Sequence, residues 1–318
     1  MSDTSTYHPS LDDPNVFVLY RYHPTRAGAI IFIVAFFLTT ALHGYQIVSH
    51  RTWYFLPLLV GGIFEIIGYV GRVLSSYDQW ALGPYIMQSL LLLVAPALFA
   101  ASVYMILGRI ILLVGGEELA LVPRRWLTKV FVMGDVLSFC LQGAGGGIQA
   151  IGTLSSLNTG EKIIIVGLFV QIVFFGFFIV VAGSFHLRFT RHNQRKQIMT
   201  PTFTATTTTM TTIPWKKHLY ALYIASALVM IRSIFRVVEY LMGNNGYLLR
   251  HEHFLYVFDA TLMFGVMVLF NVVHPSEVTT VYKDNNRYSV PLEAREMMVS
   301  TMTRRDSGCS GRSCRSLV

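Results

Sequence analysis

Seven stretches of the chain are apolar over about the 20 residues that a helix needs to cross the hydrocarbon core of a membrane. In each stretch the apolar side chains surround the whole helix rather than one stripe, which is typical of helices that face lipid. None alternates apolar and polar residues with the period of two that a transmembrane barrel requires. The pattern therefore predicts an all-α, polytopic membrane protein, with seven spans at approximately 27–48, 55–74, 85–114, 127–150, 163–187, 217–240 and 254–273.

The composition agrees with this prediction. Of the 318 residues, 53% are hydrophobic and 13% are charged, and the charged fraction is about half that of a soluble globular protein. This shortage excludes a disordered or coiled-coil chain and argues against nucleic-acid binding, despite the net charge of +8. The three cysteines, Cys140, Cys309 and Cys314, form neither a disulfide framework nor a paired metal-binding motif. No cofactor and no metal are expected.

Basic residues are distributed unevenly between the two sets of segments that connect the spans. The set that includes the N-terminal tail holds four Lys and Arg residues, and the set that includes the C-terminal tail holds seventeen. Because basic loops stay in the cytoplasm, the N-terminus is predicted outside and the C-terminus inside. The chain then divides into an extracellular tail (1–26), a membrane domain (27–275) and a cytoplasmic, disordered tail (276–318). That tail and the stretch 188–217 are candidate sites for cytoplasmic regulators.

Charged and amide side chains interrupt the apolar spans. A charge near the bilayer centre costs about 2.5–3.5 kcal/mol, so such residues usually face the bundle interior and find partners. The span directions place most of them in the extracellular half, with Glu65 near mid-membrane and Asp135 in the inner half. The candidate substrate-binding residues are Glu65, Arg72, Gln88, Asp135, Gln142, Gln171, Arg232, Arg236, Glu239, Glu252 and Asp259.

Spacing within the spans predicts which of these residues share a face. Arg232 and Arg236 are four residues apart and Glu239 follows three later, so Glu239 is placed to pair with Arg236. Four glycines within 61–71 and four within 143–147 allow neighbouring helices to approach closely. Two interpretations of the polar residues stay open. They form an ion-pair network that fixes helix register, or an amphiphile site in which carboxylates bind a cationic headgroup and arginines bind a phosphate or carboxylate.

Several of these stretches, taken in order, carry a resemblance. They read EIIGYVGR (65–72), QSLLLLVAPALFAASVYMILGRI (88–110), GDVLSFCLQGAGGG (134–147), GLFVQIVFFGFF (167–178) and IRSIFRVVEYLMGNNGYLLRHEHFLYVFDATLMFGVMVLFNVVHP (231–275). Over about 25–275 the chain resembles the fungal RTA-like (lipid-translocating exporter) family. The resemblance implies a seven-helix membrane protein whose relatives are linked to export of, or resistance to, sphingoid long-chain bases and aminosterols, and in some cases to porphyrin uptake. The family's motif positions are the same eleven polar residues, and the resemblance assigns them no settled role.

Two functions follow from these observations. The first is a translocator or exporter of amphiphilic lipids, such as sphingoid long-chain bases or toxic sterol-like amphiphiles, that confers resistance. The chain contains no GxxxxGK[ST] sequence, so it has no phosphate-binding loop for nucleotide hydrolysis. The alternative is a seven-helix, receptor-like lipid sensor, which the odd number of spans and the basic third cytoplasmic loop fit equally well. The last span has no lysine for a retinal Schiff base and no NPxxY motif.

An enzyme is not expected. A zinc hydrolase would need clustered histidines, but the six candidates form no HxxxH pair within a span: His43, His186, His218, His251, His253 and His274. The expected partners are membrane lipids or other amphiphilic small molecules, without nucleic acid. The expected location is the plasma membrane, or an endomembrane such as the vacuole or endoplasmic reticulum.

Overall fold

The computed structural model describes residues 20, 22, 24–149, 151, 153–199, 215–243 and 246–277. Within these residues the chain is helical, without a strand. The tail after 277, with Cys309 and Cys314, and the stretch 200–214 lie outside the described residues. The helices are α1 (Arg26–His50), α2 (Leu56–Ser75), α3 (Leu82–Leu113), α4 (Arg124–Gln149), α5 (Leu154–Met199), α7 (Trp215–Leu241), α8 (Tyr247–Arg250), α9 (Glu252–Leu255) and α10 (Thr261–Val272).

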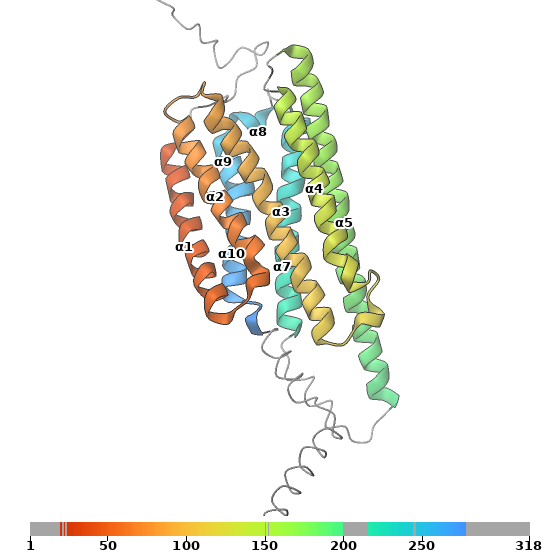
Figure 1. The fold of residues 1–318 in the computed structure, drawn as a ribbon. Helices are drawn as coiled ribbons and strands as arrows, with labels where there is room; N and C mark the ends of the chain where they lie inside the picture. The colour runs from red at the N-terminus through yellow and green to blue at the C-terminus, as the bar shows by residue number, and fades with distance from the viewer. Residues whose placement is uncertain are drawn as a thin grey trace, which may run out of the picture.

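Seven of the helical segments in the described residues are long and apolar enough to cross a membrane, which confirms the predicted count. The last of them, Glu252–Val272, combines α9, a five-residue π-helical turn (Tyr256–Ala260) and α10. The long helices form a single bundle in which successive spans run in opposite directions (Figure 1). The first helix therefore begins at one end of the bundle, here called the N-terminal end, and α10 ends at the opposite end.

The helix that contains the predicted span 163–187 is longer than that span, because α5 extends from Leu154 to Met199 and continues beyond the rest of the bundle (Figure 1). At about 1.5 Å per residue, its 46 residues measure about 70 Å, more than twice the roughly 30 Å hydrocarbon core. Hydropathy detects only the part of a helix that contacts lipid, whereas the polar turns at both ends of α5 satisfy their backbone groups within the helix. Lys162, predicted in a loop, is therefore helical.

Glycines let neighbouring helices pack closely, as the sequence predicts. A Cβ added to Gly61 would lie 2.6 Å from the ring of Phe99, and one added to Gly68 would lie 2.7 Å from Leu92. Both neighbours belong to α3, so the glycine face of α2 lies directly against that helix. A Cβ on Gly145 would lie only 2.6 Å from the carbonyl oxygen of Gly160, which brings the backbones of α4 and α5 together.

Candidate functional site

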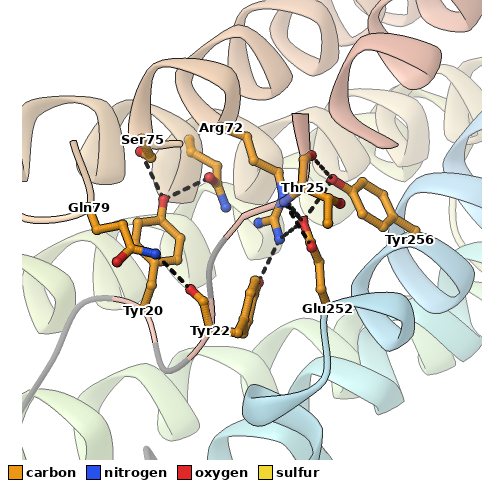
Figure 2. Close-up of polar contacts among 9 residues, drawn as sticks. Tyr20, Tyr22, Thr25, Arg72, Ser75, Gln79, Glu252 and Tyr256 are labelled. Atoms are coloured by element: carbon orange, nitrogen blue, oxygen red, sulfur yellow. Dashed lines mark hydrogen bonds and ion pairs between the residues drawn. The ribbon is translucent and has the colours of Figure 1, made fainter. Parts of the chain in front are cut away.

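A network at the N-terminal end of the bundle is centred on Arg72, in the last turn of α2 (Figure 2). Its fully buried guanidinium donates to Glu252 Oε1 from Nη2 at 2.8 Å and from Nε at 3.2 Å. Its Nη2 also donates to the hydroxyl of Tyr22 at 2.6 Å, and its Nε to the hydroxyl of Tyr256 at 3.1 Å. One arginine thus connects the segment before α1 with α2, α9 and the π-helical turn.

The carboxylate of Glu252 is the second centre of this network. It accepts hydrogen bonds from the backbone N–H of Thr25, at 3.0 and 2.9 Å to its two oxygens, and from the hydroxyl of Tyr256 at 2.9 Å. Glu252 lies in the first turn of α9, where a helix favours negative charge. We call Tyr20, Tyr22, Arg72, Gln88, Glu252 and Tyr256 the Arg72 cluster.

Tyrosines attach the segment before α1 to the bundle. The hydroxyl of Tyr20 donates to Gln88 Oε1 at 2.9 Å and lies 3.0 Å from the Oγ of Ser75. The amide of Gln79 donates to the backbone carbonyl of Tyr22 at 3.1 Å. Burial raises the pKa of Tyr20 to about 12, and burial also raises the pKa of Tyr22 above its ordinary value. Both phenols therefore remain neutral hydrogen-bond donors at physiological pH.

A second group of charges extends from the same end of α7 deeper into the bundle. Arg232 on α7 donates from Nε to Asp259 Oδ1 at 2.6 Å, and both side chains are almost fully buried. The Nη2 of Arg232 donates to the carbonyl oxygen of Leu92, also at 2.6 Å. One turn along α7, Arg236 donates from Nη1 to Glu239 Oε2 at 2.7 Å, which confirms the predicted pairing. We use the name α7 cluster for Glu65, Arg232, Arg236, Glu239 and Asp259.

Glu65 is the member of the α7 cluster that has no ion-pair contact with another described residue. Its side chain is buried, and its Oε1 has no hydrogen-bond partner among the described residues. It is close enough to Asp259, Arg232 and Arg236 for their charges to interact. One turn along α2, Tyr69 stacks between aromatic rings, with centroids 5.7 Å from Phe32, 5.8 Å from Phe36 and 6.3 Å from Tyr256.

The three remaining candidates lie on α4 and α5. Asp135 accepts a hydrogen bond from the hydroxyl of Tyr104 on α3 at 3.0 Å. Gln142 donates to the Oγ of Ser138 at 2.6 Å and to the Oε1 of Gln171 at 3.3 Å, so these two amides join α4 to α5. The structure therefore brings eight of the eleven predicted residues into the two clusters: Glu65, Arg72, Gln88, Arg232, Arg236, Glu239, Glu252 and Asp259.

Several residues of the Arg72 cluster are absent from the sequence prediction. Tyr20 and Tyr22 fall in the stretch that the sequence assigns to an extracellular tail, and Tyr256 counts as an ordinary apolar residue of a span. The signal available in the sequence was the pair of tyrosines just before the first span, since an aromatic ring with a polar tip suits a half-buried position.

Two buried histidines have structural partners. The Nε2 of His43 lies 3.0 Å from the carbonyl oxygen of Met267, and that of His218 lies 3.1 Å from Glu277 Oε2. Within the described part of the chain, no group of three or more His, Cys, Asp and Glu side chains is arranged to hold a metal ion.

Comparison with known proteins connects this arrangement to a family. The chain is 37% identical over 291 residues to protoporphyrin uptake protein 1 of Saccharomyces cerevisiae, which covers 80% of this chain and 91% of the relative. It is 28% identical to a probable lipid transporter of Emericella nidulans, and the match covers 82% of this chain and 68% of the relative. It is 23% identical to the sphingoid long-chain base transporter RSB1 of Saccharomyces cerevisiae, and the match covers 79% of this chain and 72% of the relative. No solved structure matches. The family model of RTA1-like proteins matches residues 58–281, and this chain belongs to that family.

Proposed function

We propose that this protein moves single-chain amphiphilic lipids across its membrane, and exports sphingoid long-chain bases or toxic sterol-like amphiphiles so as to confer resistance. The observation that carries the proposal is the pair of clusters, which position three arginines and four carboxylates from the N-terminal end of the bundle toward its middle. The names of two relatives, a probable lipid transporter and a sphingoid long-chain base transporter, support the same role. Both are named as transporters, so we infer that this chain is not an enzyme.

The depth of the clusters matches the position of an amphiphile in a bilayer. An amphiphile keeps its headgroup at the interface and its chain in the hydrocarbon. The Arg72 cluster lies at the end of the bundle, and the α7 cluster extends from Glu239, in the last turn of α7 at that same end, to Glu65, about two turns of helix deeper on α2 than Arg72. A headgroup that leaves the first cluster therefore meets further polar partners instead of hydrocarbon, which lowers the cost of crossing.

In this proposal the acidic and the basic residues of the two clusters bind different parts of the headgroup. Carboxylates such as Glu252 and Asp259 bind a cationic headgroup, and arginines such as Arg72 bind a phosphate or carboxylate group. Asp135, Gln142 and Gln171 bond within the α3–α4–α5 part of the bundle and brace those helices.

The orientation that we propose for the bundle rests on the distribution of basic residues. The N-terminal end of the bundle carries few Lys and Arg residues and the opposite end carries many, so we assign the N-terminal end, with the Arg72 cluster, to the exoplasmic side. The plasma membrane is the proposed location, with the vacuole or endoplasmic reticulum as alternatives.

Reconstitution of the purified protein in liposomes tests the proposal. A fluorescent sphingoid long-chain base should cross the bilayer faster than in protein-free vesicles, with no cytoplasmic partner present. A fluorescent diacyl phospholipid is the matched probe, and its rate should change less because its two chains are bulkier than one. If long-chain bases bind the protein but cross at the protein-free rate, the transport proposal fails and the receptor-like sensor is favoured.

A further inference from the structure

The α7 cluster contains more negative than positive side chains. Arg232 and Arg236 supply two positive charges, whereas Glu65, Glu239 and Asp259 supply three negative charges when all are ionised. The two arginines are each engaged with one carboxylate, Arg232 with Asp259 and Arg236 with Glu239. Within the part of the chain that the structure describes, Glu65 is left without an ion-pair contact inside a membrane-spanning helix, where an uncompensated charge is costly.

Three buried oxygen atoms, one of them on Glu65 itself, also lack hydrogen-bond partners among the described residues. They are Glu65 Oε1, Asp259 Oδ2 and the hydroxyl of Tyr69, and each of these residues is at most 2% exposed. Tyr69 interacts electrostatically with both carboxylates. Buried polar atoms rarely remain unpaired, so this group of oxygen atoms is arranged to receive a proton or a positively charged group.

The surroundings of Glu65 leave few other sources of that charge. The charged and titratable groups that face it are Asp259 from the π-helical turn, Arg232 and Arg236 from α7, and Tyr69 on α2 itself. The other helices packed on this part of α2 present uncharged side chains: Phe32, Phe36 and Thr40 from α1, Leu92 and Phe99 from α3, and Met267 from α10.

We infer that Glu65 and Asp259 together bind one proton in the empty protein, and that a bound cationic headgroup displaces it. Of these two neighbouring carboxylates, Asp259 alone is paired with a guanidinium, that of Arg232, so the two hold one proton more readily than two negative charges. The protonated carboxyl group then has an O–H that donates a hydrogen bond to one of the unpaired oxygens. When a cation enters, it supplies the missing positive charge, the O–H bond breaks and the proton leaves to water. Both carboxylates are then ionised beside the cation.

This inference rests on the proposed function and adds an energy source to it. Exchange of one cation for one proton makes the protein a proton antiporter for cationic amphiphiles, so a proton gradient can drive their transport without nucleotide. An uncharged amphiphile brings no positive charge and therefore displaces no proton.

A binding measurement on the full-length protein in lipid nanodiscs tests the exchange. The probe is a single-chain alkyltrimethylammonium ion, because its fixed charge has no proton of its own to release. In weak buffer, wild-type protein should release about one proton per bound probe, and the dissociation constant should weaken about tenfold for each unit by which the pH falls. The alcohol with the same chain length should release none.

Two variants make the test specific to Glu65. Glu65→Gln should release no proton and lose the pH dependence of binding. Glu277→Gln, a matched change of a half-exposed glutamate paired with Lys217, should behave as the wild type does. If Glu65→Gln does not fold, the proton count of the wild-type protein still decides the question, and binding of the cation without proton release overturns the inference.

Infrared spectroscopy separates this inference from the proposed function. At neutral pH and without a probe, wild-type and Glu277→Gln proteins should show a carbonyl absorption of a protonated carboxylic acid that Glu65→Gln lacks. If that absorption is the same in all three proteins, the inference fails whether or not the protein transports lipid. If the absorption is present but no amphiphile binds or crosses, the proposed function fails instead.

Discussion

Two polar regions share the same bundle but differ in charge and in the sequence separation of their partners. Arg72 and Glu252 are 180 residues apart and join helices from the two ends of the chain. Gln142 and Gln171 are 29 residues apart and join two consecutive helices through neutral amides. Neutral amides suffice to join two helices inside a membrane. The charged clusters cost far more to bury, which is our reason for assigning the function to them and a bracing role to α4 and α5.

The largest effect is expected where a buried ion pair loses one partner. Arg232→Ala leaves Asp259 buried without its guanidinium, which should lower the free energy of unfolding by about 3–5 kcal/mol. Titration of the purified protein with a denaturing detergent measures this change. Lys217→Ala, which breaks an exposed pair with Glu277, should cost about 1 kcal/mol or less. Equal losses in the two variants would contradict the distinction between buried and exposed charges.

High pH should weaken the attachment of the N-terminal segment. The pKa of Tyr20 is about 12 in the folded protein against 10.0 ordinarily, so the unfolded state loses its proton first. Stability therefore falls as the pH rises from about 10 to about 12, by on the order of 3 kcal/mol for Tyr20 alone. The difference in unfolding free energy between wild-type protein and Tyr20→Phe, measured across this range, isolates the effect. Tyr77→Phe, at an exposed ring, is the control, and a pH-independent difference for Tyr20→Phe would contradict the burial of its hydroxyl.

The close contact between α4 and α5 offers a matched pair of glycine variants. A Cβ on Gly145 would meet backbone at 2.6 Å, whereas one on Gly146 would meet nothing within 4 Å. Gly145→Ala should therefore cost about 1–3 kcal/mol of unfolding free energy through overpacking, and Gly146→Ala should cost nothing measurable or stabilise the helix. The same detergent titration compares them. A more stable Gly145→Ala protein would show that the two backbones lie further apart.

The smallest effect is expected at the amide pair. Gln142→Leu removes a hydrogen bond to Gln171 inside the membrane, and such bonds contribute about 0.6 kcal/mol on average. The double variant Gln142→Leu/Gln171→Leu should recover part of that loss, because neither amide is then left unpaired. A loss as large as that of Arg232→Ala would mean that these amides belong to a more extensive network.

The sequence predicts the parts of this structure that depend on local pattern. The seven spans follow from hydropathy, and the Arg236–Glu239 pair follows from a spacing of three on one helix. The partner of Arg72 was not predictable in the same way, since periodicity carries no information about which of several buried carboxylates a distant helix brings near. Tyr22 was missed because a hydropathy count treats everything before the first span as a tail. The ends of α5 were missed because helices continue into water.

The central claim is that the charged clusters, and not the α4–α5 amides, conduct the amphiphile. The initial rate at which a fluorescent sphingoid long-chain base crosses the bilayer of proteoliposomes tests it most directly, in two double variants that each remove both members of a pair. Arg236→Gln/Glu239→Gln keeps the total charge balanced and should reduce the protein-dependent rate at least about tenfold, equivalent to 1.4 kcal/mol in the barrier. Gln142→Leu/Gln171→Leu should retain most of the wild-type rate. A charge-neutralised protein that transports as fast as the wild type, beside an amide variant that does not, would contradict the account.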